Sequence, residues 1–457
     1  MGFILFALFS VLEVALAIWT CTKAREKRVW RKNHLILCAA QIVIVVIALL
    51  LPFGQKWRFV PVLGFLAVLL VIEGLITLIK LNKEDGTKKP AAAIVSCVLC
   101  VLLLGLLLAP AFLFTGYNGL PVSGKYQIGE VCTILIDKSR TDPFEQDGSF
   151  REVPVHFYYP VIGETDAEQF PLVVFSHGAF GYYQSNTSTY MELASNGYVI
   201  VALDHPHHAF FTEDTDGKTV IVDMNFINTA MNLNDKTDPQ EQYELYTQWM
   251  ALRTADMNFV LDELNAAGQT RATNGSWCIS DNDGESIRSV LRMTDFSRIG
   301  VMGHSMGGAA SVALGRERDD VTAVIDLDGT MLSEYTGVVD GKFTVNEEPY
   351  EVPVLEFVNW ETYNELAEFM EKNRAEGGRY PNDELMRHAA AGFTTTIRDT
   401  KHMDFTDLPL LSPYLGNMLG SGERSTEETM TIVNSLVLSF FDCYLKGEGV
   451  FTVQDSY

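Results

Sequence analysis

The run RIGVMGHSMGGAASVAL at residues 298–314 carries the clearest chemical signal in the chain. A β-branched strand leads into Gly303-His304-Ser305-Met306-Gly307, and small residues follow it. Between a strand and a helix, Gly-x-Ser-x-Gly makes a turn so sharp that the serine is strained and larger flanking side chains would collide. The pattern favours Ser305 as a nucleophile over an ordinary turn serine.

A serine hydroxyl becomes a good nucleophile when a histidine takes its proton and a carboxylate orients that histidine. In folds that use this turn, the acid and then the histidine follow the serine along the chain. Of the histidines in the chain, only His388 and His402 come after Ser305. His402 lies in RDTKHMDF, just beyond a predicted strand, at the sheet edge where active sites gather. We therefore predict His402 as the base, and His388, in a helix-like stretch, as a surface or core-edge residue.

The catalytic acid has three candidates. The segment VTAVIDLDG contains Asp326, which we expect within the strand, and Asp328, which we expect at the strand end beside Gly329. A turn at that glycine can aim Asp328 at the histidine. Glu361, after the next strand, is the rival, and the spacing alone leaves this choice open.

The oxyanion of an acyl-transfer reaction needs two backbone N–H donors. One comes from the residue after the nucleophile, Met306, and the other from a loop after an earlier strand. The segment FSHGAFG supplies that loop, which makes Ala179 the second donor. His177 precedes Ser305 and is expected to shape the loop rather than act as the base.

The segment DHPHHAFF places three histidines, His205, His207 and His208, beside Asp204. Such density is one signature of zinc sites, but histidines this close at a strand end do not converge on one metal without a contorted loop. We expect them at the rim of the active site, with no metal and no cofactor.

Aromatic side chains near the strand ends are candidates for an apolar acyl or alcohol pocket. We expect Phe180, Tyr182 and Tyr183, together with His205, to contact substrate. Phe210 and Phe211 are further candidates for lining the pocket. Aromatic residues at such positions more often belong to a core.

The elements that position these residues alternate along residues 129–457. Short β-branched runs, such as FPLVVFSHG, YVIVALDHP and VPVLEFV, are separated by amphipathic segments with helical spacing. This alternation predicts the α/β class, with a mostly parallel sheet covered by helices on both faces. We expect a catalytic domain over 129–457, preceded by a linker over 115–128.

Five of these segments, FPLVVFSHGAFG, ELASNGYVIVALDHP, RIGVMGHSMGG, LDGTM and TIRDTKHMDF, together resemble the plasma-type platelet-activating factor acetylhydrolase family. These are serine esterases of the α/β-hydrolase fold. The resemblance covers most of residues 130–446 and is interrupted near 265–290, 335–350 and 361–390.

The resemblance implies roles for particular residues. It gives Ser305 as nucleophile, His402 as base, and Asp328 rather than Glu361 as acid. It also implies that Met306 and Ala179 are the oxyanion donors and that short-chain or oxidised phospholipid esters are substrates.

Three positions depart from the family pattern. The family commonly has phenylalanine where this chain has Met306, and aromatic residues where it has Gly329 and Thr330. These positions shape the acyl pocket, so the departures concern substrate identity.

The first 114 residues predict a membrane anchor of four helices. Apolar stretches at 3–20, 35–53, 60–79 and 91–114 are each close to the ~20 residues that cross a bilayer as a helix. The first stretch lacks the preceding basic residues of a signal peptide, because its basic cluster follows it.

The charge distribution predicts orientation and excludes one class of partner. Residues 1–114 contain 12 Lys and Arg against 5 Asp and Glu, whereas the rest of the chain contains 22 against 53. So acidic a domain repels nucleic acid. The basic residues gather in the loops after the first and third apolar stretches, which the positive-inside rule places in the cytoplasm. We therefore expect a multi-pass cell-membrane protein with an extracytoplasmic catalytic domain.

A second hypothesis comes from Glu13 and Glu73, which lie within apolar stretches where charge is costly. The chain would then be a membrane sensor or transporter component whose outer domain binds ligand without turnover. We expect instead that both carboxyls are protonated or paired. The seven cysteines show no disulfide framework.

Overall fold

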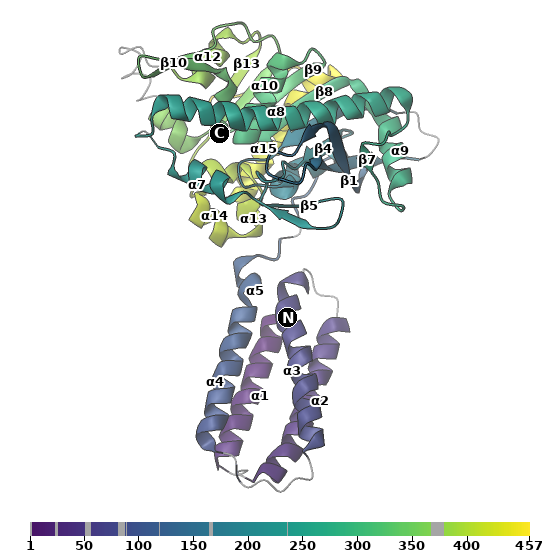
Figure 1. The fold of residues 1–457 in the computed structure, drawn as a ribbon, viewed down its shortest axis with the longest axis vertical. Coiled ribbons are helices and arrows are strands. Elements are labelled where there is room, and N and C mark those ends of the chain that lie inside the picture. Colours follow the sequence, from purple (N-terminus) through teal and green to yellow (C-terminus); the bar gives the residue numbers. More distant parts are fainter. Residues whose placement is uncertain are drawn as a thin grey trace. The chain divides into compact units, whose positions relative to one another are not determined.

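The computed structural model describes residues 2–22, 26–50, 56–80, 87, 89–117, 119–163, 168–234, 236–366 and 379–457. The chain divides into two compact units (Figure 1), one formed by Met1–Asn118 with Leu411–Leu415 and the other by Gly119–Leu410 with Gly416–Tyr457. The predicted span at 35–53 extends past Leu50 into residues outside the described ranges. Four residues of the basic loops, Lys23, Arg25, Lys83 and Lys88, also lie outside these ranges.

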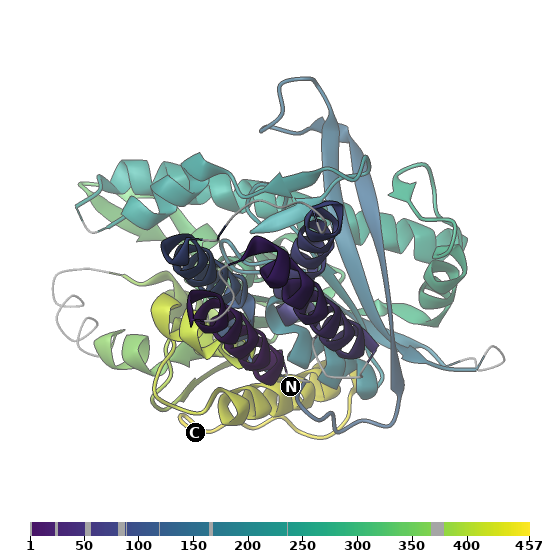
Figure 2. The same ribbon diagram turned by 90° about the horizontal axis from the view of Figure 1, so that it is seen from below.

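The N-terminal unit is a bundle of helices, which Figure 2 shows close to end-on. Helix α1 packs against α2 and α4, and α2 packs against α3. A small core forms between them around Phe9, Leu66 and Leu104, while many other apolar side chains face outward. The helices are α1 (Gly2–Thr22), α2 (Lys27–Leu50), η1 (Lys56–Phe59), α3 (Val60–Ile79), α4 (Pro90–Leu107) and α5 (Ala109–Leu113).

Three segments in the described part of the chain, Lys27–Ile47, Trp57–Ile79 and Pro90–Leu107, are long and apolar enough to cross a membrane. The apolar helical stretch Phe6–Thr22 is shorter. The expected four apolar helices are therefore present, and three of them are long and apolar enough to cross a membrane.

The second unit is built on a mixed sheet of nine strands, in the order β13-β12-β9-β8-β3-β4-β2-β1-β7. Strands β4, β3, β8, β9, β12 and β13 pair in parallel with one another in this order, and β1 and β2 add an antiparallel hairpin beside β4. The strands are β1 (Gln127–Thr141), β2 (Phe150–Val161), β3 (Phe170–Ser176), β4 (Val199–Leu203), β7 (Trp277–Cys278), β8 (Thr294–His304), β9 (Val321–Leu327), β12 (Val354–Asn359) and β13 (Gly392–Ile397). When the two-residue edge strand β7 is left out and the other eight strands are numbered in chain order, they lie side by side in the order 1-2-4-3-5-6-7-8. This is the α/β-hydrolase fold, as predicted.

Both faces of the sheet are buried, which explains why its strands are continuous apolar runs. Along β4, Val199 and Val201 face one core, and Ile200 and Ala202 face the other. Helices α8, α9 and α10 contribute to the first core, and α6 and α15 to the second. The remaining elements are η2 (Tyr183–Asn186), α6 (Thr187–Ser195), β5 (Phe211–Glu213), β6 (Thr219–Ile221), α7 (Met224–Asn232), α8 (Pro239–Thr270), α9 (Gly284–Met293), α10 (Met306–Glu317), η3 (Leu332–Glu334), β10 (Tyr335–Val339), β11 (Lys342–Val345), α12 (Pro381–His388), η4 (His402–Phe405), α13 (Leu408–Leu411), α14 (Pro413–Leu419), α15 (Thr426–Phe441) and η5 (Asp442–Lys446).

Candidate active site

Ser305 is the one residue between β8 and α10, and its backbone is strained. Its φ of 55° and ψ of −124° lie outside the regions that non-glycine residues favour. A Cβ on Gly307 would lie 2.0 Å from the carbonyl oxygen of Ser176, and one on Gly303 would lie 2.3 Å from the backbone of Gly307. Only glycine fits at either position, so the Gly-x-Ser-x-Gly pattern is required by the close approach of the backbone.

Strain is not confined to the serine. Phe180, His207, Asp328 and Asp399 have φ of 61°, 66°, 60° and 62°, and each follows a strand at the carboxyl edge of the sheet. Residues held in such conformations cluster at functional sites. The carboxyl edge is also where sheets of this kind bind ligands.

Asp328 and His402 are hydrogen-bonded. Oδ2 of Asp328, just after β9, lies 2.6 Å from Nδ1 of His402, at the start of η4. A carboxylate that accepts the Nδ1 proton leaves Nε2 as the basic nitrogen. Ser305, Asp328 and His402 all line one cavity of about 490 Å³. The structure thus brings together the three residues that the sequence suggested for catalysis.

The two competing acids make other contacts. Asp326 is fully buried in β9 and accepts the N–H of Gly329, and burial raises the pKa of its carboxyl well above the usual range. Glu361 lies at the cavity wall and pairs with Lys401 Nζ at 2.9 Å. His388 is 3.9 Å from Glu384 on the exposed end of α12.

Asn359 holds the carboxylate of Asp328 from the end of the neighbouring strand β12. Its backbone N–H donates to Oδ1 at 2.7 Å, and its side-chain amide donates to Oδ1 and Oδ2 at 3.0 and 2.9 Å. These bonds fix the carboxylate relative to His402. The sequence gives no local signal for this role, because it depends on the pairing of β9 with β12.

We expect Asn359→Ala to lower kcat by about 10- to 100-fold, as losing the support of a catalytic group typically does. KM should change little, because Asn359 acts through Asp328. Steady-state kinetics on an ester substrate measure both constants, and Asn364→Ala, which removes an exposed amide bonded to Trp360 O, is the matched control. A normal kcat in Asn359→Ala would contradict this positioning role.

His304 supports the base from the residue before the nucleophile. It is buried, and its Nε2 lies 3.1 Å from the carbonyl oxygen of His402. Burial, reinforced by the neighbouring His402, holds the pKa of His304 well below its usual value. The neutral ring can donate its Nε2 proton to that carbonyl and fix the backbone of His402.

The loop that follows β3 is held from beneath by Arg253 of α8. This fully buried guanidinium donates to the carbonyl oxygen of His177 and, at 3.3 Å, to that of Gly178. His177, also buried, lies with Nδ1 2.7 Å from Gly178 O. A Cβ on Gly178 would lie 2.8 Å from His304 Nδ1, so the loop lies directly against the nucleophile turn.

Ala179 and Met306 belong to one small apolar cluster beside this loop. Met306 is the first residue of α10, so its N–H has no acceptor within the helix and lies at the positive end of the helix dipole. Both residues remain the candidate oxyanion donors.

His205 lies in a buried network rather than on the cavity wall. Its Nε2 is 2.9 Å from Ser176 Oγ, and its Nδ1 is 3.0 Å from Asp256 Oδ2. Asp256 also accepts hydrogen bonds from Arg151 and Arg140. Burial lowers the pKa of His205 to about 4, so the ring is neutral at physiological pH. The expectation that His205 contacts substrate is not met, because its ring is fully enclosed between Ser176 and Asp256.

The aromatic residues predicted to contact substrate also lie outside the wall of this cavity, as far as the described residues define it. The ring of Phe180 packs on Phe226 at 5.2 Å, and that of Tyr183 stacks on His156 at 3.4 Å. Tyr182 is 5.4 Å from Phe211. The apolar part of the wall instead includes Met306, Leu332, Phe357 and Leu419.

The other two histidines of DHPHHAFF face separate partners. His207 stacks on Phe144 at 4.5 Å, and His208 stacks on Phe226 at 3.8 Å. The three histidines therefore have different ring contacts.

Asp407 anchors the segment that carries His402. Its carboxylate accepts the N–H and the hydroxyl of Ser188, at 2.6 and 2.5 Å, at the start of α6. Burial raises the pKa of Asp407 to about 6. Since the unfolded value is about 4, folding favours the protonated form.

The contribution of Asp407 to stability is therefore fully present below about pH 4 and is lost as pH rises through about 6, a change of about 3 kcal/mol. We expect Asp407→Asn to reduce the fall in unfolding free energy between these pH values. Urea unfolding at about pH 4.5 and pH 8 measures it. An unchanged pH dependence in the variant would contradict this assignment.

A family model described as "Platelet-activating factor acetylhydrolase, isoform II" matches residues 149–455. Platelet-activating factor acetylhydrolase of Cavia porcellus is 23% identical over 296 residues, covering 61% of this chain and 58% of that protein. The protein of the same name from Gallus gallus is 23% identical over 312 residues, covering 63% and 65%. The chain thus spans about three fifths of the length of these relatives. Among solved structures, a ferulic acid esterase from Streptomyces cinnamoneus, 23% identical, superposes with a TM-score of 0.48 over 72% of this chain and 93% of the esterase.

Proposed function

This chain belongs to the platelet-activating factor acetylhydrolase isoform II family, and on that premise we propose that it is a serine hydrolase of carboxylic esters. The hydrogen bond between Asp328 and His402, beside a strained Ser305 in one cavity, is the observation that supports this most directly. A site that only binds ligand needs no base oriented in this way.

In the proposed reaction, His402 Nε2 takes the proton from Ser305 Oγ as that oxygen attacks the ester carbonyl. Asp328 accepts the Nδ1–H bond and stabilises the imidazolium that forms. The N–H groups of Met306 and Ala179 bind the oxyanion. His402 then donates its proton to the leaving alcohol, and water, activated by the same ring, releases the acid and restores Ser305.

We propose that the substrates are amphiphilic esters with short acyl groups, including short-chain or oxidised phospholipid esters. The relatives named above support the substrate class, and the 490 Å³ cavity beside Ser305 is of a size that admits a small ester. Three apolar helices support a membrane anchor. The basic loops favour a catalytic unit outside the cytoplasm.

The substrate proposal is tested with the full chain in detergent, on p-nitrophenyl esters of increasing acyl length and on phosphatidylcholines with an acetyl or a palmitoyl group at the second position. We expect kcat/KM to fall as the acyl chain lengthens and the acetylated lipid to be cleaved faster. Hydrolysis of p-nitrophenyl acetate with equal rates for all chain lengths would contradict the substrate class alone. No hydrolysis of any ester by the folded protein would favour the ligand-binding alternative.

Orientation has a separate test. Protease added to intact cells should degrade the acidic catalytic unit, and full protection of that unit would contradict the extracytoplasmic placement.

A further inference from the structure

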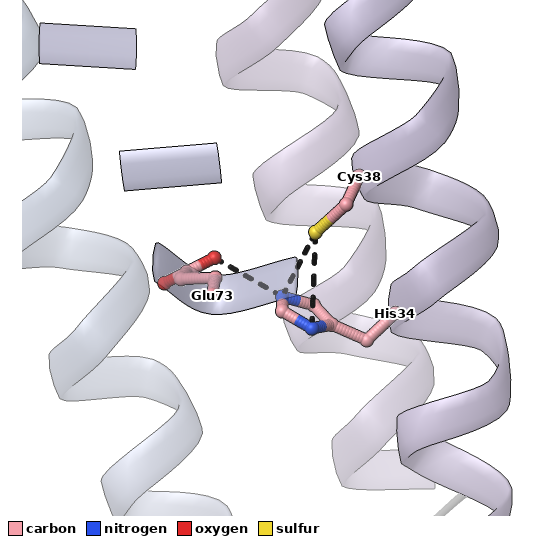
Figure 3. Close-up of side chains that lie close together, drawn as sticks. All are labelled: His34, Cys38 and Glu73. Atoms are coloured by element: carbon pink, nitrogen blue, oxygen red, sulfur yellow. Dashed lines mark hydrogen bonds and ion pairs between the residues drawn. The ribbon is translucent and has the colours of Figure 1, made fainter. Parts of the chain in front are cut away.

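Three metal-ligating side chains meet between α2 and α3 in the N-terminal unit. His34 and Cys38 lie one turn apart on α2, and Glu73 reaches them from α3 (Figure 3). His34 Nε2 lies 3.2 Å from Glu73 Oε2 and 3.8 Å from Cys38 Sγ. One ligand atom from each residue lies within 4.8 Å of both others.

These separations suit a tetrahedral zinc ion. Zinc bonds of about 2.0 Å to nitrogen and oxygen and about 2.3 Å to sulfur place tetrahedral ligand atoms roughly 3.3–3.6 Å apart. The nitrogen–oxygen pair is already at that spacing. The sulfur of Cys38 lies 3.8 Å from Nε2, and all three ligand atoms lie within 4.8 Å of one another.

The imidazole is held as metal-binding histidines usually are. Its other nitrogen, Nδ1, lies 3.2 Å from the hydroxyl of Thr77, which is buried on α3 one turn from Glu73. When Nδ1 donates its proton to Thr77, the lone pair of Nε2 faces the carboxylate. Trp30 stacks on the ring at 4.3 Å and limits its rotation.

Charge favours a cation at this position. A neutral Nε2 lone pair and a carboxylate oxygen at 3.2 Å repel each other unless a proton or a metal ion lies between them. His34 and Cys38 are buried among apolar helices, where uncompensated charge is costly. One divalent cation cancels the combined charge of a thiolate and a carboxylate.

We propose that His34, Cys38 and Glu73 bind Zn²⁺, through Nε2, Sγ and a carboxylate oxygen, with the fourth position open. The thiol and imidazole ligands select zinc over magnesium and calcium, which prefer oxygen. Binding displaces the thiol proton to solvent. This site is separate from the residues of the proposed ester chemistry.

The test uses the full chain in detergent with its affinity tag removed, stripped with chelator, incubated with Zn²⁺ and dialysed. We expect elemental analysis to find about one zinc per chain in the wild type, with the zinc lost in Cys38→Ser and in His34→Gln. Cys100→Ser, which removes a cysteine of α4, is the matched control and should retain the metal. Size-exclusion elution verifies that each variant remains folded.

Cobalt gives a second readout that identifies the ligand. Co²⁺ added to the stripped protein should produce a thiolate-to-cobalt charge-transfer band in the wild type and Cys100→Ser, and no such band in Cys38→Ser. A folded wild type that retains no zinc would overturn the proposal. So would zinc retained equally in all variants, or a cobalt–thiolate band that survives in Cys38→Ser.

Discussion

Replacing Asp328 with asparagine is expected to lower kcat about 10⁴-fold, with little change in KM. An asparagine amide can turn its NH₂ group toward His402 Nδ1 and stabilise the tautomer that presents a proton, instead of a lone pair, to Ser305. The backbone and side-chain N–H groups of Asn359 can still donate to the oxygen at the Oδ1 position, so the geometry around residue 328 should persist. Ester hydrolysis by purified variants measures the loss.

Glu361→Gln is the matched control, because it removes the competing carboxylate and breaks only an exposed ion pair with Lys401. Exposed pairs of this kind contribute little, so turnover should remain within a few-fold of wild type. If Glu361→Gln abolished turnover and Asp328→Asn did not, the assignment of the acid would be wrong.

Asp256→Asn is expected to reduce the unfolding free energy of the catalytic unit by about 3–5 kcal/mol. Asp256 is fully buried and accepts hydrogen bonds from Arg151, Arg140 and His205. Burial opposes the ionised carboxylate, but Arg151 and the hydrogen bonds prevail and hold the pKa of Asp256 below its usual range. Among the described residues, removing its charge leaves Asp142 as the remaining anionic partner of the buried Arg151 guanidinium.

Chemical unfolding of the full chain, followed by tryptophan fluorescence, measures this effect. Asp262→Asn provides the comparison, since it removes a carboxylate that is mostly exposed and pairs with Arg318 at the surface. Equal stability of the two variants would contradict a structural role for the buried network.

The nucleophile turn could be predicted from the sequence because its constraints are local. Gly303 and Gly307 are required by contacts within a few residues of Ser305 and with the end of β3. Parallel pairing also places the residues that follow β9 and β13 at the edge where β8 ends, so the positions of Asp328 and His402 could be inferred from their places after strands.

The supporting residues could not be predicted, because their roles arise from packing between distant segments. Arg253 lies in α8, a helix that begins at Pro239 and is capped by Asp238. Its contact with the loop after β3 depends on how α8 crosses the sheet. His205 was misplaced for the same reason, since its position at a strand end suggested exposure while Asp256 of α8 encloses it.

The arrangement of His34, Cys38 and Glu73 in the N-terminal unit follows only in part from the sequence. His34 and Cys38 have the i, i+4 spacing that places side chains on one face of a helix. Glu73 is a charged residue within an apolar stretch of the sequence, but its partners depend on the packing of α2 against α3.

Labelling the full chain with a fluorophosphonate probe tests whether Ser305 is a catalytic nucleophile. We predict stoichiometric labelling of the wild type, loss of labelling in Ser305→Ala, and normal labelling in Ser297→Ala, which alters a serine in the irregular part of β8 between Asp295 and Ile299. A folded wild type that does not react, or a Ser305→Ala variant that labels as strongly as the wild type, would contradict the claim.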